Sequence, residues 1–304
     1  MVQFDSHTTA ETVAKAFANE IKDKTVLITG VTLGGFGAEA ARVLALVGAK
    51  VILAGRSVEK IRETANHIKK ETPSAELHEL VLDLGSQQAV RQAAAQVLEY
   101  QEPIDVLILN AGTMCTSHGK TPEGIELQFA TNHIGNFLFT NLIIPKLLEA
   151  TAPRVVTIAS VAHLWTDIRY DDINLEKEEK YDKWIAYGQS KTANILFALE
   201  LAERYKDKKL LAFSLHPGGS LTSMTDHMTT EDYLRLSDGW NPDGTPKGDW
   251  IRTVEECAAN HIVAGFDPSI ADKSGSYLVE CQVTTDPQHL QPYASNKVNP
   301  TFES

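Results

Sequence analysis

The sequence has few cysteines and no long apolar run. Its 304 residues include only Cys115, Cys257 and Cys281, which are far apart and belong to no CxxC or HExxH pattern. This spacing predicts neither a metal site nor a disulfide framework, and it favours a reducing compartment. No run approaches the roughly 18 apolar residues of a membrane span, and residues 1–24 contain no apolar leader core. We therefore expect a cytoplasmic protein with no membrane partner.

An excess of positive charge is also missing. The chain has 28 Lys and Arg residues against 40 Asp and Glu residues, a net charge of −12, and a pI near 5.3. Binding to nucleic acid or to an anionic membrane needs clustered positive charge, which displaces counterions or meets headgroups. The composition therefore excludes both classes of partner, and any anionic ligand must be bound by local groups.

What the chain does have is a regular alternation of apolar runs and helical patterns. The expected strands are residues 25–29, 51–54, 77–82, 104–109, 154–159 and 210–215. The expected helices are residues 9–22, 38–47, 58–70, 86–99 and 186–205. This alternation predicts an α/β protein with a doubly wound parallel sheet of about seven strands, a Rossmann fold. No linker divides residues 1–304, so we expect a single domain.

A glycine-rich loop joins the first expected strand to its helix. It reads Gly30-Val31-Thr32-Leu33-Gly34-Gly35-Phe36-Gly37. Where a Cβ is absent, backbone N–H groups and a helix N-terminus can approach a pyrophosphate. The alternative is a turn whose glycines serve only tight packing, but the position between a buried strand and a helix favours dinucleotide binding.

The second strand ends at Gly55-Arg56-Ser57, where a dinucleotide-binding fold distinguishes its cofactors. An acidic residue at this point would bind both ribose hydroxyls of NAD, and the sequence has none at the strand end. Arg56 instead offers a charged fork to the 2′-phosphate of NADP. Arg56 could also be an ordinary solvated residue at a helix start, but the sequence favours NADP(H) over NAD(H).

The segment Tyr187-Gly188-Gln189-Ser190-Lys191 places a phenol and an ammonium on one helix face. A positive charge about 4 Å from a phenol could lower its pKa by up to on the order of three units, from roughly 10, which would suit proton transfer. Alternatively, Tyr187 is a packing residue and Lys191 extends past it to solvent. The spacing alone does not decide between these interpretations.

Taken in order, the motifs of residues 22–282 resemble the short-chain dehydrogenase/reductase family, in the branch of the retinol dehydrogenases and the WW-domain oxidoreductase, with a fungal-type character. They are the glycine loop, Asp83-Leu84, Asn110-Ala111-Gly112, residues 131–137, residues 160–163, residues 186–191, His216-Pro217-Gly218 and residues 275–277. The glycine loop has one residue more than the TGxxxGxG pattern of the family. We expect Gly34 to accommodate the extra residue.

The resemblance implies a catalytic relay of four residues. Tyr187 would be the general acid and base, and Lys191 would lower its pKa and hold the nicotinamide ribose. Ser160 would donate a hydrogen bond to the substrate oxygen, and Asn132 would order a helix bend and a water. By themselves, Ser160 could be a strand-end cap and Asn132 a buried amide at a helix break. His133 and His163 adjoin the relay and are expected to be structural.

The resemblance also implies a set of cofactor contacts. These are Gly30, Thr32, Gly35, Phe36, Gly37, Arg56, Asp83, Leu84, Asn110, Ala111, Gly112, Tyr187, Lys191, Pro217, Gly218 and Thr222.

The sequence thus predicts an NADP(H)-dependent oxidoreductase, a carbonyl reductase or alcohol dehydrogenase, acting on a bulky, largely apolar ketone or aldehyde. Two alternatives are an NADP(H) sensor on the same fold, for which an intact relay is unnecessary, and a reductase of an activated double bond or an epimerase. Residues 164–185 and 221–250 are expected to cover the substrate. We expect 221–250 to be a mobile flap, with a loop at 237–246, and to offer Met224, Met228, Tyr233, Leu236 and Trp240, facing Met114 and Trp165.

Assembly as a monomer or a homodimer stays open at this point. The tail from Thr284 to Ser304 is polar and contains proline, so it is expected to be an interface or partly disordered.

Overall fold

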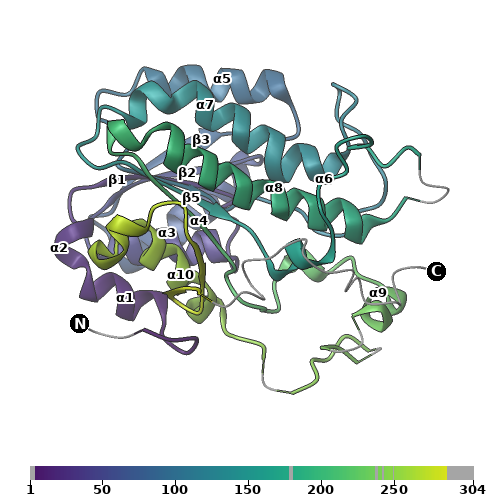
Figure 1. Ribbon diagram of the computed structural model, residues 1–304. Helices are drawn as coiled ribbons and strands as arrows, with labels where there is room; N and C mark the ends of the chain where they lie inside the picture. The colour runs from purple at the N-terminus through teal and green to yellow at the C-terminus, as the bar shows by residue number, and fades with distance from the viewer. Residues whose placement is uncertain (1–3, 178–180, 237–238, 242, 249, 286–304) are drawn as a thin grey trace.

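The computed structural model describes residues 4–177, 181–236, 239–241, 243–248 and 250–285 (Figure 1). The expectations for the tail from 286, for residues 178–180 and for residues 237, 238, 242 and 249 therefore lie outside the described residues.

The described residues are organised around one eight-stranded sheet with the order β3-β2-β1-β4-β5-β6-β7-β8. The strands are β1 (Thr25–Thr29), β2 (Lys50–Gly55), β3 (Glu76–Val81), β4 (Val106–Leu109), β5 (Arg154–Ile158), β6 (Leu211–Leu215), β7 (Tyr277–Val279) and β8 (Gln282–Val283). All neighbours pair in parallel except β7 and β8, which are antiparallel. The order departs from β1 in both directions, which confirms the doubly wound Rossmann fold.

The central strands are buried on both faces, which explains their continuous apolar sequences. Every residue of β1, β4 and β5 is buried, whereas β3 at the sheet edge is mostly exposed. The sequence predicts about seven strands, and the structure has an eighth of only two residues. The chain reverses into β8 through Glu280 and Cys281, both with positive φ, and so short a strand leaves no pattern to detect.

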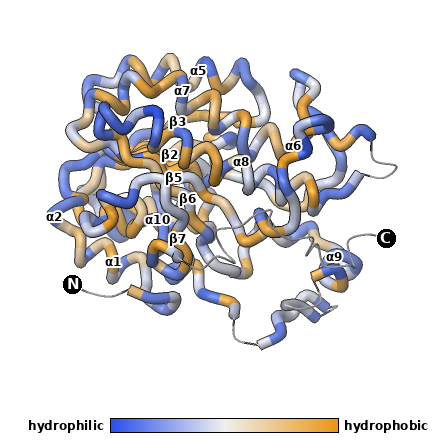
Figure 2. The backbone as a smooth tube through the Cα atoms, in the orientation of Figure 1, coloured by the Kyte–Doolittle hydropathy of each residue, from blue (hydrophilic) through white to orange (hydrophobic). Residues whose placement is uncertain are grey.

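Helices cover both faces of the sheet (Figure 1). One layer contains α1 (Ala10–Ala16), α3 (Phe36–Leu46), α4 (Val58–Glu71) and α10 (Val254–Phe266). The other contains α5 (Gln87–Leu98), α7 (Gly135–Leu147) and α8 (Lys183–Arg204). In Figure 2 the central strands between these layers are mostly coloured as hydrophobic, while α5 shows both hydrophilic and hydrophobic residues along its length. The core therefore consists of two apolar clusters, one on each face of the sheet.

The helix boundaries follow their capping residues. Ser57 and Ser86 accept hydrogen bonds from the first turns of α4 and α5. The expected helix at residues 9–22 is instead two helices, α1 and α2 (Ala18–Ile21), because Phe17 between them has non-helical backbone angles.

The segment 221–250 contains more helix than the sequence suggests. A short 3₁₀ turn, η4 (Ser223–Thr225), and a helix, α9 (Thr230–Arg235), lie in its first half. Helix α9 begins with a capping box in which Thr229 and Asp232 bond each other's backbone N–H groups. The described residues of the second half contain no helix, as the density of turn formers predicts.

The three cysteines are unpaired and buried. No helix among the described residues has both the length and the apolar character needed to cross a membrane.

Candidate active site

Helix α8 brings Tyr187 and Lys191 together. The two residues are one helical turn apart, and the Lys191 Nζ atom lies 5.4 Å from the centroid of the Tyr187 ring. Both side chains are buried, with exposures of 6% and 3%. Lys191 Nζ also donates a hydrogen bond of 3.0 Å to the Ile158 carbonyl at the end of β5. The ammonium is therefore fixed between the helix and the sheet.

Ser160 follows the end of β5 and faces the same tyrosine. Its hydroxyl accepts a hydrogen bond of 3.2 Å from the Ala162 N–H and so caps the 3₁₀ turn η2 (Val161–Trp165). The same side chain lies beside the Tyr187 phenol and lowers its pKa. Ser160 thus combines the capping position with contact to Tyr187.

Asn132 lies in a π-helical turn, η1 (Ala130–Ile134), that leads directly into α7. Its Oδ1 accepts from the Thr113 N–H at 2.7 Å, and its Nδ2 donates to the Thr113 carbonyl at 2.9 Å and to the Ser190 hydroxyl at 3.0 Å. A Cβ built on Gly112 would lie 3.2 Å from Asn132 Oδ1 and 3.5 Å from Lys191 Nζ. The turn after β4, the π-turn and α8 therefore converge at one point.

Burial dominates the electrostatics of the relay. It lowers the pKa of Lys191 to about 8, because a buried ammonium loses its hydration. It raises the pKa of Tyr187 above the ordinary value of 10.0, and the influence of Ser160 offsets only part of this rise. The pKa of Tyr187 is therefore shifted in the direction opposite to the one expected from the charge of Lys191. Burial disfavours the charged phenolate, and the helical spacing of Tyr187 and Lys191 carries no information about burial.

The glycine loop is packed tightly at both of its ends. Gly30 has φ of +75°, and a Cβ there would lie 2.6 Å from the Ala111 Cα. A Cβ on Gly37 would lie 2.4 Å from Asn110 Nδ2. These two glycines are thus required by packing against the segment after β4, and the backbone of that segment adds a bond of 2.9 Å from the Ala111 N–H to the Thr29 hydroxyl.

The middle of the loop is open. Gly34 has φ of +81°, and no other group lies within 4 Å of the position its Cβ would occupy. Its left-handed backbone is one that glycine adopts without strain, and it agrees with the expectation that Gly34 accommodates the extra residue. Gly35 then caps α3 without a side chain, and its N–H bonds the Thr32 carbonyl at 3.0 Å. The first N–H groups of α3 consequently face the loop, an arrangement suited to a phosphate group.

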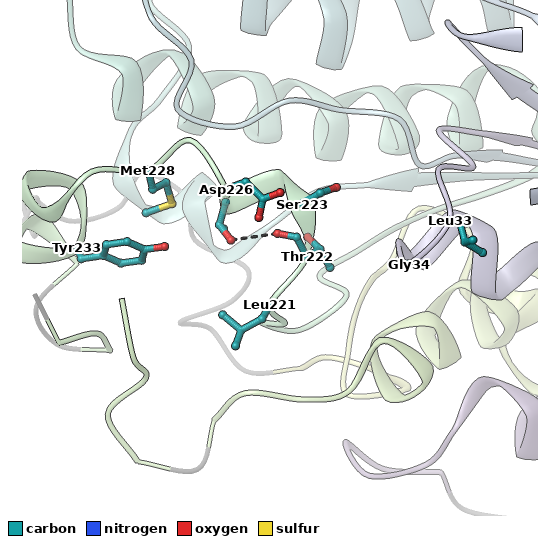
Figure 3. A pocket seen from close by; sticks show the side chains of 9 residues that line it. Leu33, Gly34, Leu221, Thr222, Ser223, Asp226, Met228 and Tyr233 are labelled. Atoms are coloured by element: carbon teal, nitrogen blue, oxygen red, sulfur yellow. Dashed lines mark hydrogen bonds between the residues drawn. The ribbon is translucent and has the colours of Figure 1, made fainter. Parts of the chain in front are cut away.

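A cavity of about 470 Å³ separates this loop from the segment 221–250 (Figure 3). Leu33 and Gly34 line one side, and the other side is formed by Leu221, Thr222, Ser223, Thr225, Asp226, Met228 and Tyr233. Its volume is in the range of small-molecule sites. Thr222, an expected cofactor contact, therefore lies across a cavity from the glycine loop.

The remaining expected cofactor residues lie after the carboxyl ends of neighbouring parallel strands. Arg56 follows β2, is exposed, and has no hydrogen bond or ion pair within the described part of the chain. Asp83 follows β3, and its Oδ1 accepts from the Gly85 N–H at 3.0 Å. Leu84 is buried, and its carbonyl packs so closely on Gly135 that a Cβ there would approach to 2.3 Å.

Pro217 and Gly218 follow β6. Gly218 has φ of +105°, and a Cβ there would lie 3.1 Å from the Cys257 Sγ. Together with Gly30, Asn110 and Ser160, these residues place the expected site along one edge of the sheet.

Contacts that the sequence did not predict fasten α9 to the start of α8. Arg235 Nη2 lies 2.5 Å from Asp182 Oδ2, and Lys183 Nζ lies 2.5 Å from Asp232 Oδ1. Asp182 also caps α8 through the Trp184 N–H, at 2.8 Å. These pairs join residues about fifty positions apart in the sequence, so no local spacing reveals them. They connect the segment 221–250 to the helix that carries Tyr187.

Aromatic side chains from both covering segments lie near this helix. The Trp165 ring is 5.4 Å from the Trp184 ring and 6.5 Å from the Tyr187 ring. His227 Nε2 is bonded to the Met114 carbonyl at 2.8 Å. Trp240, in contrast, is buried between other aromatic rings of its own segment, Tyr233 and Trp250. It packs the segment together.

The two histidines beside the relay have structural neighbours. His133 Nδ1 is bonded to Asn194 Oδ1 at 3.2 Å, and His163 Nδ1 to the Ser160 carbonyl at 2.6 Å. The His163 ring also packs edge-on against Tyr277. These contacts agree with the structural role expected for both.

Comparison with known proteins identifies the family. The sequence profile described as short chain dehydrogenase matches residues 24–170. Short-chain dehydrogenase/reductase prx1 of Penicillium rubens is 38% identical over 268 residues, which cover 87% of this chain and 76% of that protein. Retinol dehydrogenase 12 of Mus musculus is 38% identical over 224 residues, covering 71% of this chain and 70% of that protein.

A solved structure from Shigella flexneri, described as a short chain dehydrogenase complexed with NADP, has a TM-score of 0.62 at 25% identity. The match covers 86% of this chain and 98% of that one. The chain belongs to the short-chain dehydrogenase/reductase family, and it is an oxidoreductase of that family. The relatives include a fungal protein and retinol dehydrogenases, as the resemblance predicts.

Proposed function

We propose that the protein is an NADP(H)-dependent carbonyl reductase or alcohol dehydrogenase in which Tyr187 transfers the proton. The observation that carries this proposal is the buried Tyr187 phenol, with the Ser160 side chain beside it and the Lys191 ammonium 5.4 Å from its ring centroid. A phenol, a hydroxyl and a cation at one strand end are the groups that a carbonyl reduction needs.

The chain's own residues handle the proton and the developing charge. A bound nicotinamide supplies or accepts the hydride. Tyr187 Oη donates its proton to the carbonyl oxygen during reduction and takes it back in the reverse direction. Ser160 Oγ donates a hydrogen bond to the same oxygen. Because burial raises the pKa of Tyr187, the phenol is protonated at neutral pH and can act as the general acid of the reduction.

Lys191 and Asn132 would support this transfer. Lys191 Nζ uses one N–H for the Ile158 carbonyl, which leaves donors for a ribose hydroxyl. With a pKa of about 8, it is charged in most molecules at neutral pH. Asn132 holds the turn before α7 against α8 through Ser190.

The residues present fit a dinucleotide phosphate. The uncapped start of α3 and the cavity beside Gly34 suit a pyrophosphate. Arg56, exposed at the end of β2, would bind the 2′-phosphate that distinguishes NADP from NAD. The NADP complex of the Shigella flexneri relative supports this choice.

The substrate would be a bulky, largely apolar ketone or aldehyde. Trp165 beside Tyr187 and the cavity residues Met228 and Tyr233 offer apolar surface from the two covering segments, 164–185 and 221–250. An apolar cover would exclude water from the hydride transfer. Assembly as a monomer or a homodimer and a cytoplasmic location stay predictions.

An NADP(H) sensor on the same fold would need the glycine loop but not the Tyr187, Ser160 and Asn132 arrangement. A screen of carbonyl compounds with NADPH, followed by nicotinamide absorbance, separates the two functions. We expect NADPH oxidation with bulky apolar aldehydes or ketones. Tight binding of NADPH with no turnover of any carbonyl compound, and no turnover of alcohols with NADP, would favour the sensor. Turnover of only activated double bonds would instead assign a reductase of such bonds.

A further inference from the structure

A buried histidine of α10 lies directly behind the glycine loop. His261 has no exposed surface, and its Nε2 lies 3.1 Å from Asn110 Oδ1. Its ring also packs edge-on against Phe36, the first residue of α3, with ring centroids 6.2 Å apart. His261 therefore contacts the helix start that follows the loop and the asparagine that lies beneath it.

The carboxamide of Asn110 has only one orientation that fits its neighbours. Its Nδ2 donates to the Thr29 carbonyl at 3.0 Å and to the Gly30 carbonyl at 2.9 Å. These bonds use both N–H groups, and the opposite orientation would place Oδ1 against two carbonyl oxygens. Oδ1 must therefore face His261, where it can only accept a hydrogen bond.

This requirement fixes the tautomer of the histidine. The proton must lie on Nε2 of His261 for the ring to donate to Asn110. Nδ1, which is buried and makes no geometrically acceptable hydrogen bond among the described residues, is then the unprotonated nitrogen. A proton on Nδ1 would face the Cys257 backbone instead, but it would leave two acceptors, Nε2 and Asn110 Oδ1, 3.1 Å apart. Burial lowers the pKa of the ring to about 4, so it is neutral at pH 7.

The two ends of the glycine loop, at Gly30 and Gly37, have no room to compensate for a displaced Asn110 amide. A Cβ on Gly37 would lie 2.4 Å from Asn110 Nδ2 and 2.6 Å from the Gly30 carbonyl oxygen. The start of α3, the Asn110 amide and the end of β1 are thus in direct contact. A rotation of the amide would move the first turn of α3 or free the Gly30 carbonyl.

We propose that His261 is a positioning residue for the glycine loop: its Nε2–H holds the Asn110 amide in the orientation that fixes Gly30 and the start of α3 for a dinucleotide pyrophosphate. The proposal rests on the proposed function for the identity of the ligand. It assigns a role in cofactor affinity to a side chain on a different helix, which would touch neither the cofactor nor the substrate.

Two variants of His261 test the role. His261→Leu removes the donor and leaves Asn110 Oδ1 unsatisfied, and we expect the Kd for NADPH and the Kd for NADH to rise alike, by about tenfold. His261→Gln keeps an amide N–H that can reach Asn110, and we expect both Kd values within about twofold of the parent. An equal rise in the Kd for NADPH and for NADH indicates loop positioning, because loss of 2′-phosphate recognition would raise only the Kd for NADPH.

His133→Leu is the matched control. It removes a largely buried histidine that bonds Asn194 and packs against Phe129, Phe137 and Phe197, far from the glycine loop in sequence. We expect it to lower Tm to a similar extent as His261→Leu while leaving the cofactor Kd unchanged. If both variants raised the cofactor Kd equally, His261 would act only through core packing, and the proposal would be overturned.

Nuclear magnetic resonance of the full chain with ¹⁵N-labelled histidine tests the contact itself. At neutral pH we expect the signals of a neutral ring with its proton on Nε2 to disappear from the spectrum in His261→Leu. The proposal would be overturned if the ring lost in His261→Leu were protonated on Nδ1, or if His261→Leu bound NADPH with the same Kd as the parent protein. A parent protein that binds neither NADPH nor NADH would overturn the proposed function and the cofactor role together, whereas the tautomer would still decide the Asn110 contact.

Discussion

Asn132 donates a hydrogen bond of 3.0 Å to the Ser190 hydroxyl, which in turn donates one of 2.7 Å to the Tyr187 carbonyl. The amide in the π-turn is therefore connected to the turn of α8 that carries the proposed proton donor.

This connection predicts coupling between the two residues. Asn132→Ala leaves the Thr113 N–H and carbonyl without their partner, so the free energy of unfolding should fall by about 1–3 kcal/mol. Ser190→Ala should have a smaller effect, and the double variant should differ from the sum of the single ones by at least about 0.5 kcal/mol. Chemical denaturation of the parent, the two single variants and the double variant gives one double-mutant cycle for stability. The kcat values of the same four proteins give a second cycle for activity. Asn141→Ala, on the outer side of α7, is the control, and strict additivity in both cycles would contradict the coupling.

The proton transfer is tested at the phenol. Tyr187→Phe should retain Tm and cofactor Kd while kcat falls by at least about a hundredfold, the lower range for a positioned proton donor. Tyr100→Phe, at a half-buried tyrosine that follows α5, should retain parent turnover. A Tyr187→Phe protein that reduces a carbonyl substrate at nearly the parent rate would end the relay hypothesis.

Cofactor choice is tested at Arg56. Arg56→Ala should raise the Kd for NADPH by about 10- to 150-fold, because a charge-assisted hydrogen bond contributes roughly 1.5–3 kcal/mol. The Kd for NADH should hardly change. Arg62→Ala, an exposed arginine of α4 paired with Glu79, is the matched control. If titration finds NADH bound by the parent as tightly as NADPH, the preference for NADP(H) is wrong.

The ion pairs at the start of α8 predict how the segment 221–250 behaves as a flap. Chymotrypsin should cut within this segment quickly in the free protein and slowly with NADPH and an inhibitor bound. Lys183→Gln and Arg235→Gln should each accelerate cleavage of the ligand-bound form several-fold, because they leave Asp232 and Asp182 without their cations.

Arg204→Gln breaks an exposed pair with Glu200 on the same helix and serves as the control for the flap. Cleavage at equal rates with and without ligands would exclude a flap, even with an active enzyme.

Acid should destabilise the fold through His133 and His261. Burial lowers the pKa of each ring to about 4 from an ordinary value of 6.5. Between these values the unfolded chain binds more protons, so the free energy of unfolding falls as the pH falls through this window, by up to about 3 kcal/mol for each ring. Carboxylates with lowered pKa, such as Asp232, lose their contribution only at lower pH. Denaturation across the window should give a flatter profile for the double variant His133→Leu/His261→Leu, and an unchanged slope would contradict the assignment.

The sequence was sufficient for the parts of the fold that depend on local pattern. Six of the eight strands followed from apolar runs within a few residues of their observed bounds, and the glycine loop was placed between β1 and α3. Strand ends in a parallel sheet share one edge, so the positions of Ser160, Asn110 and Arg56 along that edge also followed.

What the sequence could not give depends on contacts over long distances. The direction in which the Tyr187 pKa shifts depends on burial by residues from several elements. The spacing of Tyr187 and Lys191 indicates only the favourable effect of a nearby positive charge. The pairs Lys183 with Asp232 and Asp182 with Arg235 join segments that no short pattern relates. The partnership of His261 and Asn110 spans 151 positions in the sequence and appears only when α10 packs behind the loop.

Because all three thiols are buried, the native cysteines should not react with reagents used for site-specific labelling. Cys115 and Cys257 are 1% exposed and Cys281 is 6% exposed, and burial raises the pKa of Cys257 and Cys281 to about 12. Since a thiol-reactive dye needs an accessible thiolate, it should attach only to a cysteine introduced at the surface. Leu234→Cys, at a position 52% exposed on α9, would then report movements of the flap by fluorescence without removal of any native cysteine.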